Sequence, residues 1–174
     1  WDEKILKASL FIKRNERVHI LGPRPIVKMA GCVASQSDLN IAPITNVLHR
    51  LMHCMDQGYG KGFAKCFAED GVLEIKIAKS KSEGREAIAK SCEGIHGKFC
   101  SAPLRCKHWE GNVYVETVNE NTATNLSYWK ALSGGEIVST GIHRDTFVRS
   151  QTDGAWLVKY RMIEHTWTKA GGHV

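Results

Sequence analysis

From Pro43 onward, apolar residues recur at intervals of three and four positions, which is typical of a helix with one buried face. These positions are Ile44, Val47, Leu48, Leu51, Met52 and Met55. Gly58 follows them, and glycine is frequent just past the end of a helix. The pattern therefore predicts a helix that ends near Gly58 and carries Asp56 in its last turn.

Shorter patterns predict three more elements before residue 94. Phe63 and Phe67 share one face of a short second helix, which we expect to end at the acidic turn over residues 69–71. Alternation of apolar and polar residues over 72–77 predicts a strand. A third helix is expected over residues 84–93.

The last seventy residues consist of β-rich runs at 113–118, 122–132, 136–149 and 155–167. The separators are rich in glycine, asparagine and aspartate, which accept the backbone angles of tight hairpin turns. The predicted fold class is α+β: three N-terminal helices packed in a strongly curved mixed, mainly antiparallel β-sheet.

Residues 1–40 differ from this pattern, because the breaker Gly22-Pro23-Arg24-Pro25 excludes one long helix there. We interpret them as an N-terminal extension, followed by one domain over 41–168 and a C-terminal tail over 169–174. The extension holds too many apolar residues for a solvated tail. We expect it to pack on its own domain, on a second copy in a homodimer, or on a partner in a larger assembly. Because the chain begins at Trp1 rather than Met, we expect that something preceding it was removed.

Composition mostly excludes classes of function. The 174 residues are 43% hydrophobic, which suits one buried core, and no apolar run reaches the roughly 18 residues of a transmembrane segment. The net charge of +6 is spread among interleaved acids, which argues against nucleic acid as a partner. We therefore expect a soluble or peripheral protein.

The six cysteines include no Cys-x-x-Cys pair and favour reduced thiols in a reducing compartment, the cytosol or an organelle interior. Cys92, His96 and Cys100 have the spacing of one helical face, as a zinc site would require. Gly94 and Gly97 should interrupt such a helix. We therefore expect these three residues to diverge and predict no metal.

Seven short motifs occur in a fixed order between residues 42 and 168. They are Met55-Asp56-Gln57-Gly58, Phe67-Ala68-Glu69-Asp70-Gly71-Val72, Gly84-Arg85-Glu86-Ala87-Ile88, His108 with Asn112, Thr122-Ala123-Thr124, Gly141 with His143 and Asp145, and Asp153-Gly154 with Trp156 and Arg161. In this order the chain resembles the SnoaL-like family of the nuclear-transport-factor-2-like cone fold. The resemblance implies a cone-shaped α+β barrel around an apolar pocket, with no cofactor. The family includes scytalone dehydratase, bile-acid dehydratase and polyketide cyclase relatives, and also members that only bind or scaffold.

The resemblance also implies a catalytic pair. Asp56 matches the helix aspartate of the dehydratase-type relatives, and His108 matches their strand histidine. In those enzymes the imidazole removes a proton next to a carbonyl group, and the carboxylate orients the ring or holds a water molecule. We expect the two side chains to be buried and within reach of one water-bridged hydrogen bond.

Two departures weaken the match. Leu51 and Met55 stand where dehydratase relatives carry carbonyl-polarising tyrosines, and no carboxylate lies between residues 125 and 132. His143 and Tyr128 are the candidate proton donors. Candidate substrate-binding residues are Tyr128, Asn125, Asp145 and Arg161, although Asp145 and Arg161 are also expected to form a structural ion pair, with His143 a core histidine.

Two functions therefore remain open. One is cofactor-independent dehydratase or isomerase chemistry on a small cyclic or polyketide-like molecule, with an apolar or aromatic ligand in the pocket. The alternative is a non-catalytic SnoaL-like accessory or scaffold subunit of a larger complex, docked through residues 1–40.

Overall fold

The computed structural model describes residues 41–102 and 105–169, except for the side chains of residues 117 and 118. The extension over 1–40 and all but the first residue of the C-terminal tail lie outside the described residues. The elements are α1 (Ala42–Gln57), α2 (Gly60–Lys65), β1 (Phe67–Ile75), β2 (Ser80–Glu83), α3 (Gly84–Ile95), the π-helical turn η1 (His96–Cys100), β3 (Lys107–Asn119), β4 (Thr122–Ser133), β5 (Glu136–Arg149) and β6 (Trp156–Thr168).

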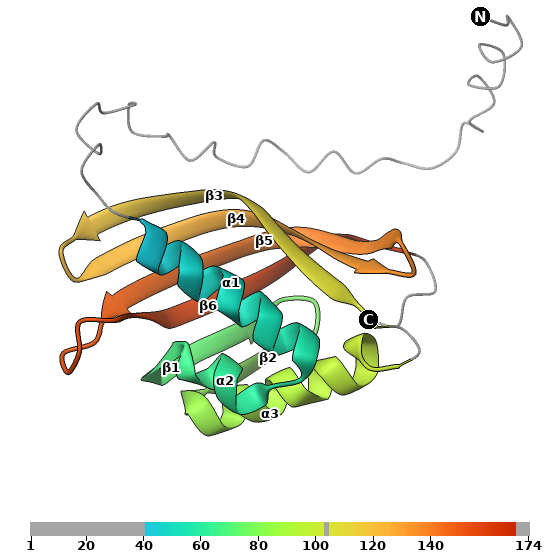
Figure 1. Cartoon of the computed structure of the whole chain (residues 1–174), viewed down its shortest axis with the longest axis horizontal. Coiled ribbons are helices and arrows are strands. Elements are labelled where there is room, and N and C mark those ends of the chain that lie inside the picture. Colours follow the sequence, from blue (N-terminus) through green and yellow to red (C-terminus); the bar gives the residue numbers. More distant parts are fainter. Residues whose placement is uncertain (1–40, 103–104, 170–174) are drawn as a thin grey trace, which may run out of the picture. The chain divides into compact units, whose positions relative to one another are not determined.

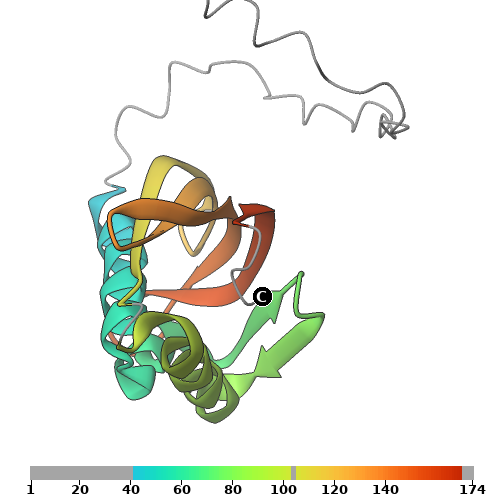
Figure 2. The same cartoon turned by 90° about the vertical axis from the view of Figure 1, so that its right-hand side faces the viewer.

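The strands form one mixed sheet in the order β2-β1-β6-β5-β4-β3. All neighbours pair antiparallel except β1 and β6, which are parallel. Figure 1 shows α1 lying across one face of β3 to β6, with α2 and α3 beside β1. In the side view of Figure 2 the sheet curves around these helices. The predicted α+β class and the mixed, mainly antiparallel sheet are confirmed, and β2 and β3 leave the sheet open at its edges.

Helix α1 follows its predicted hydrophobic pattern. Its buried residues are Ile44, Leu48, Leu51, Met52, Cys54 and Met55. Gly58 caps the helix in the left-handed conformation at a φ of 66°, and its N–H donates to Met55 O at 3.1 Å. This cap fixes the last turn, so that Asp56 emerges at a defined position next to the start of β3.

Several elements differ from the sequence prediction, beginning with α2, which ends at Lys65, so that Phe67 starts β1 instead of lying on the helix. Residues 69–71 lie within β1, where the pairing with β6 shifts register between Phe67 and Val72, and not in a turn that precedes the strand. The four-residue strand β2 was not predicted, and β3 begins six residues earlier than expected. Helical backbone also continues from α3 through η1. A Cβ on Gly94 or Gly97 would meet nothing within 4 Å, so both glycines lie on an open helix surface.

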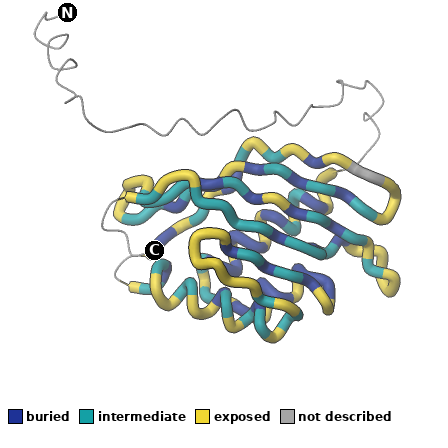
Figure 3. The backbone as a smooth tube through the Cα atoms, turned by 180° about the vertical axis from the view of Figure 1, so that it is seen from behind, coloured by how far each residue is buried: buried dark blue, intermediate teal, exposed yellow. Residues whose placement is uncertain are grey.

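Alternation of burial along the long strands defines an inner face toward the helices and an outer face (Figure 3). On β4 the inner side carries Ala123, Asn125, Ser127, Trp129 and Ala131. The main core joins the inner side chains of the sheet to α1, α2 and α3. No helix within residues 41–102 and 105–169 is long and apolar enough to cross a membrane.

Candidate active site

Asp56 and His108 meet directly at the inner edge of the sheet. The last turn of α1 supplies Asp56, and the second residue of β3 is His108. Asp56 Oδ1 lies 2.8 Å from His108 Nδ1, and the two side chains are 9% and 17% exposed. The backbone N–H of His108 also donates to both carboxylate oxygens, at 3.1 and 3.2 Å. Three short contacts therefore hold these two residues, here called the dyad, in one arrangement.

The dyad geometry determines which ring nitrogen of His108 carries the proton. An ionised carboxylate only accepts hydrogen bonds, so Nδ1 must be the donor to Asp56. In the neutral ring Nε2 then holds the unshared electron pair. No hydrogen bond to Nε2 occurs within the described part of the chain, so this nitrogen is available to accept a proton or bind a ligand.

The ring of Trp129 connects His108 with two further histidines. Its centroid lies 6.3 Å from His108, 5.7 Å from His143 in a stacked arrangement and 4.8 Å from His165 edge to face. The ring fits because β5 has glycine at position 141, where a Cβ would lie 2.6 Å from the indole. Neither Trp129 nor His165 belongs to the residues that the sequence motifs indicated as candidates for the site.

Beyond Trp129, the inner face holds a buried polar network of Glu110, Asn125, Ser127, His143, Asp145 and Arg161. Arg161 is fully buried and contacts Asp145 Oδ1 at 2.7 Å through Nε and Oδ2 at 3.1 Å through Nη2. Its Nη2 also donates to Glu110 Oε1 at 3.1 Å.

The remaining members of the network are joined to it by further hydrogen bonds. Glu110 Oε1 accepts from Ser127 Oγ at 2.5 Å and lies 3.0 Å from His143 Nδ1. Asn125 Nδ2 donates to Asp145 Oδ2 at 2.8 Å. The expected ion pair between Asp145 and Arg161 is thus present, and Asn125 and His143 join it.

Burial and charge set the protonation of this network. Burial opposes ionisation of Glu110, but the Arg161 charge and the hydrogen bonds from His143 and Ser127 outweigh it and lower the pKa of Glu110 to about 2. For His143, burial first and then the Arg161 charge lower the pKa below the usual 6.5. His143 is therefore a neutral ring whose Nδ1–H is directed to Glu110. This leaves no proton on its Nε2, which argues against the expected role of His143 as a donor.

Five buried polar atoms in this region have no hydrogen-bond partner among the described residues. They are Glu110 Oε2, Asn125 Oδ1, Trp129 Nε1, Arg161 Nη1 and His165 Nδ1. Buried polar groups of proteins are nearly always paired, with water or a ligand where protein partners are lacking. The interior of the cone therefore has unused donors and acceptors that could orient a polar group of a small molecule.

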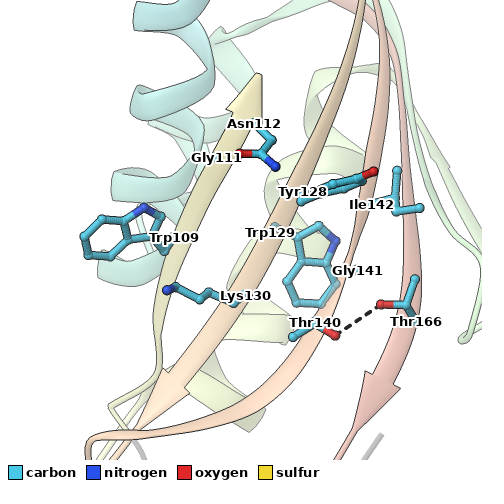
Figure 4. Close-up of a pocket in the computed structure, with 10 residues that line it drawn as sticks. All are labelled: Trp109, Gly111, Asn112, Tyr128, Trp129, Lys130, Thr140, Gly141, Ile142 and Thr166. Carbon is cyan, nitrogen blue, oxygen red and sulfur yellow. Dashed lines mark hydrogen bonds between the residues drawn. The ribbon is translucent and has the colours of Figure 1, made fainter. Parts of the chain in front are cut away.

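Tyr128 lies away from the dyad. It is 54% exposed and belongs to the outer face, because it alternates with the inner residues Ser127 and Trp129. It lines an open depression of about 660 Å³ together with Trp109 and Lys130, and Figure 4 draws these side chains. The Lys130 ammonium lies 5.0 Å from the Trp109 ring centroid. The structure thus brings Tyr128 together with outer-face residues and not with the expected catalytic pair.

The five described cysteines are free thiols. Cys92 belongs to the main core, whereas Cys100 lies with Cys106 and Trp129 in a second apolar cluster. A hydrogen bond from Cys100 lowers the pKa of Cys106 to about 7, and the same contact raises the pKa of Cys100.

Sequence reasoning missed Glu110 because the strand was expected to begin at Val113. Extending the two-residue period back to His108 would have placed Glu110 on the same face as His108. For Trp129 the corresponding signal was its two-residue spacing from Ser127 and Asn125, which places all three side chains on one face of the strand.

Comparison with known proteins places this chain in a family. The model of the SnoaL-like domain matches residues 39–162. A putative scytalone dehydratase from Novosphingobium aromaticivorans is 26% identical, with a TM-score of 0.63 over 77% of this chain and 87% of that chain. The protein Aln2 from a Streptomyces species is also 26% identical, with a TM-score of 0.63 over 71% and 89% of the two chains.

A protein of unknown function with a cystatin-like fold from Nostoc punctiforme is 19% identical, with a TM-score of 0.65 over 74% of this chain and 92% of that chain. At that identity the likeness concerns the fold alone. No curated protein matches the chain in sequence. The family model covers most of the chain, and the architecture agrees with it. The chain therefore belongs to the SnoaL-like domain family.

Proposed function

We propose that this SnoaL-like protein is a cofactor-independent dehydratase or isomerase that acts on a small cyclic or polyketide-like molecule. The observation that carries the proposal is the contact of 2.8 Å between Asp56 Oδ1 and His108 Nδ1, which directs Nε2 of the imidazole away from the carboxylate. The likeness to a putative scytalone dehydratase supports the same class of reaction.

In the proposed reaction His108 Nε2 removes a proton from the carbon next to a carbonyl group. The electron pair of the broken C–H bond forms an enolate, and Asp56 stabilises the resulting imidazolium. In a dehydration, a new C=C bond forms as the β-hydroxyl group leaves, and His108 returns its proton to that oxygen to give water. In an isomerisation, the proton returns to a different carbon. Neither route consumes a cofactor.

The enolate oxygen needs a hydrogen-bond donor, because stabilisation of developing charge is usually a large part of catalysis. The tyrosines of dehydratase relatives are replaced by Leu51 and Met55, both buried. We assign the donor role to Trp129, whose buried Nε1–H has no partner among the described residues and whose ring centroid is 6.3 Å from that of His108.

Proton exchange tests this proposal without knowledge of the natural substrate. The metal-free protein would be incubated in D₂O with a panel of cyclic β-hydroxyketones, and loss of the α-proton followed by NMR. We expect exchange by the wild type and a loss of about 100-fold or more in His108→Ala. His53→Ala is the matched control, because His53 is an exposed histidine on α1. Equal exchange by wild type and His108→Ala would contradict the assignment of the base.

A second candidate function is a non-catalytic binding or accessory subunit. The observation that favours it is the exposed aromatic surface of the sheet, where Trp109, Tyr114 and Tyr128 are 64%, 44% and 54% exposed. Under this alternative the buried polar network is structural, and substitution of Trp109 or Tyr128 weakens partner binding while His108→Ala has no effect on it.

A further inference from the structure

Three soft metal ligands converge beside the dyad. Cys100 ends η1, Cys106 precedes β3, and His108 is the second residue of that strand. One ligand atom from each of the three residues lies within 4.8 Å of the other two. This group differs from the set Cys92, His96 and Cys100 that has helical spacing in the sequence. It shares only Cys100 with that set, and it includes His108 of the dyad.

The backbone explains why these residues meet. At the end of η1, the N–H of Ser101 donates to His96 O at 2.9 Å, and the N–H of Arg105 donates back to Ser101 O at 3.0 Å. The second bond holds Arg105 beside Ser101, so Cys106 lies near Cys100, and the two thiols share one apolar cluster. Cys106 and His108 are two positions apart in extended chain, so their side chains point to the same side. Both thiols are buried, each 4% exposed.

The dyad supplies the outer partner that metal-binding histidines usually have. A ligating histidine generally donates its second ring N–H to a carboxylate, which fixes the ring and its tautomer. Asp56 accepts from Nδ1 of His108 at 2.8 Å and leaves Nε2 as the nitrogen that can bind a metal.

We infer that Cys100, Cys106 and His108 form a binding site for a zinc ion, with water or a small-molecule heteroatom in the fourth position. Two thiolates and an imidazole suit zinc, whereas magnesium and calcium require oxygen ligands. Tetrahedral zinc bonds would separate these ligand atoms by roughly 3.5–3.8 Å. The upper limit of 4.8 Å in the structure is close enough for side-chain rotation to close the difference.

Zinc in this site would bind Nε2 of His108, which is also the atom that accepts the proton in the proposed reaction. This consequence rests on the proposed function: a zinc-loaded protein loses the proton-transfer activity of His108, and chelation restores it. The binding site itself does not depend on that activity.

Cobalt substitution tests the site directly. The experiment uses the full chain with Cys32→Ser, because Cys32 lies outside the described residues, under reducing conditions. We expect one Co²⁺ per chain, a thiolate-to-cobalt charge-transfer band and displacement of that band by one equivalent of Zn²⁺. Cys100→Ser, Cys106→Ser and His108→Ala should each weaken binding or lose the band. Asp56→Asn should weaken binding by about 10–100-fold, as expected for an outer partner.

Cys66→Ser is the matched control. Cys66 is also a buried cysteine, and its thiol donates to Gly62 O at 3.6 Å, which a serine hydroxyl can do as well. Circular dichroism verifies that each variant folds. Absence of the charge-transfer band in folded protein, or an unchanged band in Cys100→Ser and Cys106→Ser, overturns the inference. Proton exchange by metal-free protein is measured separately, so failure of the zinc site and failure of the proposed function give different results.

Discussion

At the scale of single residues, Arg161 is the charge on which the inner polar network depends. It is fully buried between Asp145 and Glu110, and removing one partner of a buried ion pair leaves the others uncompensated. We expect Arg161→Met to lower the free energy of unfolding by about 3–5 kcal/mol, measured by urea denaturation. Lys159→Met is the control, because Lys159 pairs with Asp70 at the surface, and it should have a much smaller effect. Equal losses in the two variants would contradict this role of Arg161.

The histidines of the inner face predict how stability depends on pH. Burial lowers the pKa of His143 and of His165 in the folded protein, so the unfolded chain binds their protons at a higher pH. Their contribution to the free energy of unfolding is present above the usual pKa of 6.5 and is lost as the pH falls below that value. The pKa of Glu110 is lowered from 4.5 to about 2, so the protein loses further stability as the pH falls from 4.5 to about 2.

The measurement is the free energy of unfolding as a function of pH. Charges around His143 come from Glu110 on β3, Arg161 and His165 on β6, and Asp145 on its own strand. We expect stability to fall on acidification below 6.5, and His143→Gln to reduce the slope just below that pH. A wild-type protein that gains stability from pH 7 to pH 5 would contradict the protonation states described above.

At the scale of elements, the contact of β5 with β6 depends on Gly141. A Cβ there would lie 2.0 Å from Glu164 O and 2.6 Å from the Trp129 ring. Gly141→Ala should therefore destabilise the protein by about 1–3 kcal/mol through overpacking and displace the indole, which Trp fluorescence would report. Gly111→Ala is the control, because a Cβ at Gly111 meets nothing within 4 Å. No difference between the variants would show that the strands can adjust.

The elements also show how far the sequence could predict the site. The helix that carries Asp56 was predictable, because its apolar period and its terminal glycine indicated the same end. The start of β3 was not, because Cys106 to Asn112 lacks a regular apolar alternation and its burial depends on α1 and β4. On β4, the alternation of faces decides that Tyr128 lies on the outer face and Trp129 on the inner face. A shift of one residue along the strand therefore decides whether a side chain lies on the same face as the dyad or on the opposite face.

At the scale of the whole molecule, deletion of residues 1–38 distinguishes a self-contained enzyme from an accessory subunit. The main core is built from residues between Ile44 and Ile163, so we expect a chain without residues 1–38 to unfold cooperatively. Lost stability without loss of a partner favours a self-contained enzyme. An intact monomer that leaves its native complex favours the subunit. If neither stability nor association changed, the predicted docking role of the extension would be wrong.

The central claim is that Asp56 holds His108 in the tautomer whose Nε2 can accept a proton. Long-range ¹H–¹⁵N correlation NMR on metal-free protein labelled at its eight histidines measures this directly, with His108 assigned by comparison with His108→Gln. Above the titration range of imidazole, the account predicts a protonated Nδ1 and an unprotonated Nε2 for His108, with that preference reduced in Asp56→Asn. A proton on Nε2 in the wild-type protein, or the same spectrum in Asp56→Asn, would contradict it.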